Sequence, residues 1–118
     1  MSEKNQLRED CIDFAIAFSD IAETIKGCSV YVTQAVRSSS SIGANLHEAK
    51  YAQSTADFIN KLELSLKEAY ETEYWLELLF RKKKITEEQF HNLQNQCGSI
   101  RRRLIASITT AKKKMPLR

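Results

Sequence analysis

Residues 54–80 read STADFINKLELSLKEAYETEYWLELLF, and this stretch decides the fold class. Its small and apolar residues recur in alternating steps of four and three, which is the repeat of one face of an α-helix. The members of this stripe are Phe58, Leu62, Ser65, Ala69, Thr72, Leu76 and Leu79. Ser54, followed three residues later by Asp57, resembles a capping box at a helix start. The pattern predicts a helix over residues 55–82.

Three further segments show the same repeat. Their stripes lie in residues 7–25, 32–49 and 90–111. They predict helices over residues 4–26, 29–52 and 86–114, the last opened by a capping box of Thr86 and Gln89. Short linkers make successive helices antiparallel neighbours. Residues 1–118 are therefore expected to form one domain, an all-α antiparallel up-down-up-down four-helix bundle with a left-handed twist.

The composition agrees with a helical, globular protein. The chain has 118 residues, of which 42% are hydrophobic and 28% charged, with three Gly and one Pro. No segment approaches the ~20 apolar residues of a membrane span, and the polar N-terminus has no signal-peptide core. Three cysteines without Cys-x-x-Cys spacing argue against a disulfide scaffold. We therefore expect a cytoplasmic protein without a membrane partner.

Residues 37–44 read RSSSSIGA and are rich in poor helix formers. A loop is one interpretation of this run. A helix is the preferred one, because the apolar stripe continues through it in phase from Val32 to Ala49. Small side chains at these positions would let a neighbouring backbone approach closely.

Three strings carry a family resemblance: RSSSSIGANLHEA at 37–49, STADFINKL at 54–62 and KEAYETEYWLELL at 67–79. Together they resemble the bacterial four-helix-bundle proteins encoded in intervening sequences of 23S ribosomal RNA genes. Accessory variability proteins of diversity-generating retroelements are similar. The resemblance implies a bundle that assembles into a ring, expected to be a pentamer, without known enzymatic activity. Through the retroelement relatives it implies nucleic acid and a reverse transcriptase as partners.

The helix predicted over 55–82 is apolar over more of its circumference than one core requires. The residues that widen its stripe include Tyr70, Tyr74, Trp75 and Leu78. A second apolar face is most simply buried against another copy, so we predict that these four residues form a subunit interface of a homo-oligomer. Alternatively, the aromatic rings lie over the bundle edge with their polar tips in water.

Charge is distributed unevenly along the chain. Residues 1–80 hold 7 Lys and Arg against 13 Asp and Glu, net −6, whereas residues 81–118 hold 11 against 2, net +9. We predict RNA or other nucleic acid as the partner of the second segment, whose basic runs are Arg81, Lys82, Lys83 and Lys84, then Arg101, Arg102 and Arg103, then Lys112, Lys113 and Lys114.

The last two runs are spaced to form a ridge. They lie 11 residues apart, close to three helical turns or about 16 Å, so corresponding members project in nearly the same direction. Arg102 and Lys113 are predicted to point most directly outward. Aromatic residues are not interleaved with the basic ones, so readout of a base sequence is not expected.

Two other interpretations of the basic residues stay open. In one, the last helix packs near an acidic helix of a neighbouring subunit that carries Glu63, Glu68, Glu71 and Glu77. The protein would then be an oligomeric protein-interaction scaffold with charge-complementary interfaces. In the other, lysines near helix C-termini complement the helix dipole on a solvated face.

Catalysis is not expected, and we predict no catalytic residues, no cofactor and no metal. The spacing Glu88-x-x-His91 occurs once, whereas di-metal bundles need two such motifs and two further glutamates. The serines at 38–41 lack a nucleophile elbow and a paired base.

Arg37, Asn45 and Glu48 are predicted to share one helix face. Glu48 follows Arg37 by 11 residues and Asn45 by three, which places the three side chains in similar directions. We interpret them as a polar network that holds helices or subunits together. A ligand or partner site is the alternative.

Overall fold

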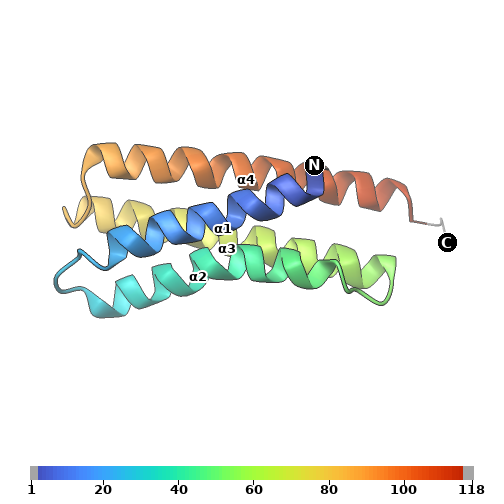
Figure 1. Ribbon diagram of the computed structural model, residues 1–118, viewed down its shortest axis with the longest axis horizontal. Helices are drawn as coiled ribbons and strands as arrows, with labels where there is room; N and C mark the ends of the chain where they lie inside the picture. Colours follow the sequence, from blue (N-terminus) through green and yellow to red (C-terminus); the bar gives the residue numbers. More distant parts are fainter. Residues whose placement is uncertain (1–2, 116–118) are drawn as a thin grey trace.

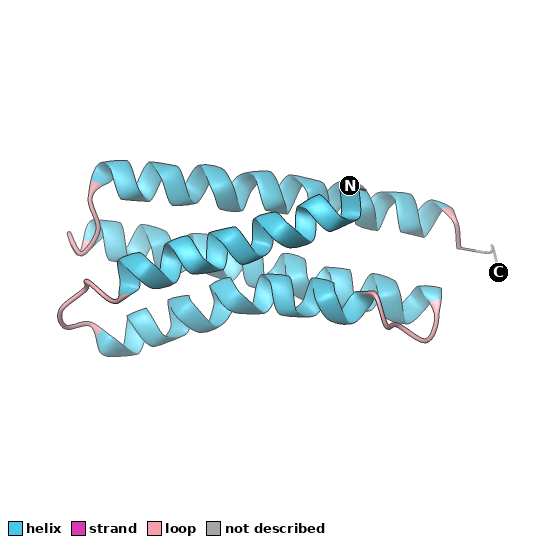
Figure 2. Ribbon diagram, viewed as in Figure 1, coloured by secondary structure: helices cyan, strands magenta, loops and turns pink. Residues whose placement is uncertain are grey.

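The computed structural model describes residues 3–115, with side chains from Gln6 onward, and this part of the chain is helical with short connections (Figure 1, Figure 2). The helices are α1 Glu3–Ala22, α2 Ser29–Ala49, α3 Thr55–Arg81 and α4 Glu87–Lys113. No strand occurs within these residues. The predicted all-α four-helix class is confirmed.

Successive helices run in opposite directions, so α1 and α3 point the same way (Figure 1). Close contacts join α1 to α2, α2 to α3, α3 to α4 and α1 to α4, whereas the diagonal pairs do not approach each other over the described residues. The four helices therefore occupy the corners of a square in cross-section. The C-terminal turns of α4 extend past the N-terminal end of α1 (Figure 1).

Two helix ends differ from the expectation by more than one residue. The prediction that the first helix continues to residue 26 is wrong, because α1 ends at Ala22 and tighter bonds follow, from Thr24 N to Ile21 O at 3.0 Å and from Ile25 N to Ala22 O at 3.1 Å. Gly27 and Cys28 then turn the chain with φ of 79° and 56°. The second helix likewise ends at Ala49 rather than residue 52.

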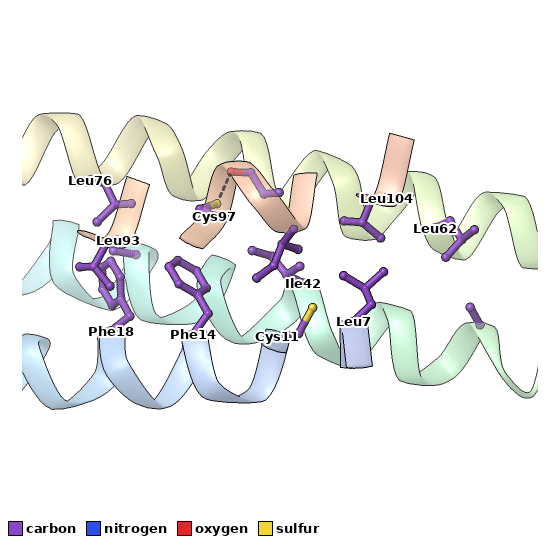
Figure 3. Close-up of a cluster of buried hydrophobic side chains, with 14 of the residues drawn as sticks. Leu7, Cys11, Phe14, Phe18, Ile42, Leu62, Leu76, Leu93, Cys97 and Leu104 are labelled. Carbon is purple, nitrogen blue, oxygen red and sulfur yellow. Dashed lines mark hydrogen bonds between the residues drawn. The ribbon is translucent and has the colours of Figure 1, made fainter. Parts of the chain in front are cut away.

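The stripes found in the sequence form the core (Figure 3). Phe14, Ile42, Leu76 and Leu104 are fully buried. Leucine, isoleucine and phenylalanine each contribute roughly 1.5–3 kcal/mol when withdrawn from water, so this shared interior stabilises the bundle. The labelled members in Figure 3 come from all four helices, namely Leu7, Cys11, Phe14, Phe18, Ile42, Leu62, Leu76, Leu93, Cys97 and Leu104.

The serine run is helical, which confirms the preferred interpretation. Ser38 is completely buried, and Thr72 Oγ1 of α3 donates a hydrogen bond to its Oγ at 2.9 Å. Ser65 Oγ donates to Ile42 O at 2.6 Å. A buried hydroxyl needs such a partner, and these bonds form only where two backbones come close. The small residues therefore set the close approach of α2 and α3.

Capping residues fix where α3 and α4 begin. Ser54 Oγ accepts from Asp57 N at 3.0 Å. Thr86 Oγ1 accepts from Gln89 N at 3.0 Å, and Thr86 N donates to Gln89 Oε1 at 2.9 Å, which confirms the capping box. These bonds satisfy amide groups that have no partner inside the helix.

Candidate nucleic-acid interface

The outward face of α4 carries positive charge without a balancing carboxylate. Arg102, Lys113 and Lys114 are exposed and form no ion pair with any residue between 6 and 115. No acidic residue follows Glu88 in the sequence, so α4 itself supplies none beyond its first turn. The core contacts of α4 explain why Arg102 and Lys113 point outward, since Leu93, Leu104 and Ala111 occupy the opposite side of the helix.

The neighbouring cations of the ridge are engaged within the chain. Arg101 Nε donates to Glu73 Oε1 of α3 at 2.7 Å, and its guanidinium lies 5.8 Å from the centre of the Tyr70 ring. Lys112 Nζ lies 3.4 Å from Glu63 Oε2, also on α3. The pairing of the last helix with acidic residues of the third, considered above between subunits, thus occurs inside one chain for Arg101 and Lys112.

On the other side of α4, Arg103 Nη1 donates to Asp10 Oδ2 of α1 at 2.8 Å. The hydrogen bond from Gln6 and the one from Arg103 lower the pKa of Asp10. A lowered carboxyl pKa stabilises the folded state above the ordinary pKa of the group, and this contribution is lost as the pH falls through the folded value. Arg103 therefore serves the α1–α4 contact at neutral pH.

The basic segment 81–84 lies at the other end of the molecule, where Arg81 ends α3 and the next three residues form the turn to α4 (Figure 1). Arg81 pairs with Glu77 at 2.6 Å, and Lys84 Nζ donates to Lys26 O at 2.9 Å. Lys82 and Lys83 are exposed. Because the longest dimension is 51 Å, the ten predicted contact residues form two separate surfaces rather than one.

The predicted polar network is divided in the structure. Arg37 donates to Glu68 at 3.0 Å and to Glu71, which also accepts from Trp75 Nε1 at 3.1 Å. Lys61 of α3 pairs with Glu48 at 2.9 Å. Arg37 and Glu48 thus each tie α2 to α3 through a separate ion pair.

Asn45, the third predicted member, bonds within its own helix, where Nδ2 donates to Ser41 O at 2.9 Å. No hydrogen bond among the described side chains joins it to Arg37 or Glu48. The three residues share a helix without sharing contacts.

The residues predicted as a subunit interface differ in exposure. Tyr70 and Tyr74 are 52% and 62% exposed. Trp75 is partly buried against Tyr31 of α2, with ring centres 6.0 Å apart, and Leu78 is partly buried. Trp75 therefore belongs mainly to the seam between α2 and α3, while the two tyrosines project from the bundle.

A further surface was not anticipated from the sequence. Ile12 and Ile16 of α1 are 39% and 54% exposed and line a hollow of about 410 Å³ between α1 and α2. Small residues of α2, including Ser40, Gly43 and Ala44, form its other wall. The sequence feature that could have predicted this surface is the spacing of the two isoleucines, which lie four residues apart and outside the core stripe of α1.

The thiols are expected to differ in reactivity. Burial raises the pKa of both Cys11 and Cys97 to about 12, so neither forms the reactive thiolate near neutral pH, whereas Cys28 is only partly buried. Brief treatment with iodoacetamide at pH 7.5 should modify Cys28 alone, as read by peptide mass spectrometry. Treatment in denaturant should modify all three; native labelling of Cys11 at the rate of Cys28 would contradict the packing.

Within residues 3–115, no helix is long and apolar enough to cross a membrane. The side chains of residues 6–115 likewise bring no three His, Cys, Asp or Glu residues together in a metal-binding group.

The family model of the 23S rRNA-intervening sequence protein matches residues 3–106. The fold is similar to a crystal structure from Bacteroides thetaiotaomicron, a protein with unknown function from the S23 ribosomal protein family. The two are 42% identical with a TM-score of 0.86, and the match covers 92% of this chain and 99% of the other. Comparison with curated proteins gives no match. The sequence resemblance is thereby confirmed: the chain belongs to the 23S rRNA-intervening sequence protein family.

Proposed function

We propose that this protein is a non-catalytic, oligomeric, cytoplasmic bundle protein that binds RNA or another nucleic acid through the outward face of α4. The observation that carries the proposal is the exposure of Arg102 and Lys113 on one face of α4 that has no carboxylates, with the exposed Lys114 directly after the helix. The family resemblance adds the expectation of a pentameric ring.

The chemistry of this face suits a phosphate backbone. Arg102 and Lys113 lie 11 residues apart on one helix, or about 16 Å, so two phosphate groups along a strand or across a groove can be contacted together. Arginine can donate two parallel hydrogen bonds to one phosphate. Such contacts release counterions, do not read bases and weaken steeply with salt.

Lys82 and Lys83, at the opposite end of the bundle, offer a second contact for a long nucleic acid. In a ring, both surfaces recur once in every copy. Several weak contacts then act together, and the combined affinity exceeds that of one copy.

The proposal predicts that Arg102→Glu weakens binding of a fluorescently labelled structured RNA by about tenfold at low salt, because one attraction becomes a repulsion. Lys50→Glu is the matched control: it makes the same charge change at an exposed site at the end of α2 and should have a much smaller effect. Fluorescence anisotropy from 50 to 300 mM salt measures both. A flat salt response, no binding at low salt, or equal effects of the two variants would refute the proposal.

The second candidate is an oligomeric protein-interaction scaffold, with a partner such as a reverse transcriptase. It is favoured by the ion pairs that engage Arg101, Arg103 and Lys112, and by the exposed rings of Tyr70 and Tyr74. Absence of salt-dependent RNA binding in the experiment above would favour this function.

A further inference from the structure

Two exposed stripes, on α1 and α3, have the same spacing and end residues of opposite charge, while Glu77 and Asp20 are also exposed on the same sides of these helices. The α3 stripe consists of Lys67, Tyr70, Tyr74 and Arg81. The α1 stripe consists of Glu9, Ile12, Ile16 and Glu23. Each stripe begins with a charged residue, continues with two large apolar or aromatic residues and ends with a second charged residue. Successive members are three, four and seven residues apart. Such steps keep all four side chains on one side of a helix.

The structure keeps both stripes open to solvent. All eight residues are exposed, and Ile16 and Tyr74 are among the most exposed large apolar or aromatic side chains, at 54% and 62%. Glu23 follows the end of α1, but its N–H donates to Ser19 O at 3.0 Å, which continues the helical path. Glu23 therefore lies on the same side of the helix as the other three members of the α1 stripe.

The charged ends are available to a partner. Lys67 and Glu23 form no ion pair with a described side chain. Glu9 pairs with Arg8 at 2.7 Å and Arg81 with Glu77 at 2.6 Å, but both pairs are exposed. Exposed ion pairs contribute at most about 1 kcal/mol, so they can be exchanged for contacts with another chain.

The directions of the helices allow the two stripes to meet only between copies. Inside one chain α1 and α3 lie at diagonal corners and make no close contact over residues 3–115. They run the same way (Figure 1), so copies related by rotation about an axis along the bundle would bring α3 of one beside α1 of the next in parallel. In this register Lys67 lies opposite Glu9, and Arg81 lies opposite Glu23.

We propose that the α3 stripe of one copy packs against the α1 stripe of a second copy, with Tyr70 and Tyr74 beside the hollow between α1 and α2. The proposal deepens the proposed function, because it rests on the oligomer and names the surfaces that would form it. Tyrosine contributes apolar area while its hydroxyl remains in water, and the isoleucines and small residues of the hollow accept the rings. The opposite charges at both ends select the parallel register.

A contact between two different surfaces is head-to-tail. Each copy presents one stripe of each kind, so the contact repeats and closes into a ring when the rotation between copies divides a full turn. Neither stripe contains Arg102, Lys113 or Lys114. The assembly therefore does not use the cations assigned to nucleic acid.

Blocking the stripes one at a time tests the contact. We expect Ile16→Glu and Tyr74→Glu each to convert the protein to a species of 13.6 kDa in light scattering, while the unaltered chain gives a multiple of this mass. A mixture of the two variants should give a dimer of twice 13.6 kDa, since one intact stripe of each kind remains and the chain of contacts then stops. Val30→Glu, at a 69% exposed valine outside both stripes, is the control and should leave the assembly unchanged.

Charge exchange tests the register. Reversal of Lys67 and Arg81 to glutamate should dissociate the assembly at low salt, and additional reversal of Glu9 and Glu23 to lysine should restore it. Circular dichroism and urea unfolding of each variant show that the loss is not a loss of fold.

The outcomes separate this inference from the proposed function. An oligomer that survives Ile16→Glu, or a mixture that remains at 13.6 kDa, overturns the stripe contact but leaves RNA binding through Arg102 intact. A wild-type chain that is monomeric at micromolar concentration overturns both the stripe contact and the oligomer. Assembly without salt-dependent RNA binding supports the stripes and rejects the nucleic-acid function.

Discussion

Replacement of Phe14 by alanine is expected to lower the free energy of unfolding by about 3–5 kcal/mol. The ring is fully buried in the core and meets Phe18 edge to face, with ring centres 6.4 Å apart. Removal leaves a cavity that the neighbouring helices can close only in part. Phe14 lies on α1, which is the shortest of the described helices and packs against both α2 and α4. The loss of its ring therefore weakens both of these helix contacts.

Urea unfolding followed by circular dichroism measures the effect, at one protomer concentration because assembly contributes to apparent stability. Val30→Ala serves as the control, since Val30 is 69% exposed and such changes usually lie within about 0.5 kcal/mol. A loss below about 1 kcal/mol for Phe14→Ala would mean that the ring is not packed as the structure shows.

Replacement of Ser38 by leucine should lower the free energy of unfolding by about 2–4 kcal/mol. Ser38 has no exposed area and accepts the hydrogen bond of Thr72 across the α2–α3 contact. Leucine would force the two helices apart and would leave Thr72 Oγ1 with only its bond to Glu68 O of the same helix, at 2.8 Å. Leucine is the better helix former, so the loss would show that close packing, not helix propensity, governs this position.

Ser40→Leu is the matched control, two residues further along the same helix. Ser40 is exposed at the hollow between α1 and α2, where a longer side chain has space. Both serine variants are compared in the Tyr74→Glu background, in which no second copy covers the hollow, and there we expect the free energy of unfolding of Ser40→Leu to stay within about 0.5 kcal/mol of its parent. Equal losses in the two variants would contradict the close approach of α2 and α3 at Ser38.

The fold could be predicted because local and global signals agree. The stripe of Phe14 and the capping box at Thr86 depend on residues close in sequence, and both are found as expected. The end of α1 was missed because Ile25 continues the apolar stripe and packs against the core although it lies beyond Ala22, in the tighter turns that follow the helix. Burial of Ser38 could be anticipated only as a consequence of small size, since its partner Thr72 is 34 residues away.

The candidate site could be predicted only in part, because charge pairing between helices is not visible in a sequence. Helical geometry alone points Arg102 outward, and it is exposed. Arg103 has the same residue type but reaches Asp10, 93 residues away, and Arg101 reaches Glu73. The spacing of residues within one helix carries no information on ion-pair partners in another helix. For the same reason, the separation of Arg37 from Glu48 into two ion pairs emerged only in three dimensions.

The order of the helices around the square also has a kinetic consequence. Three of the four neighbouring pairs are hairpins of consecutive helices, so they require the closure of only short loops. The contact between α1 and α4 joins the two ends of the chain, so its formation costs the largest loss of chain entropy among the four contacts. We therefore expect the helical hairpins to form early in folding. The α1–α4 contact, with its ion pair between Arg103 and Asp10, would form last.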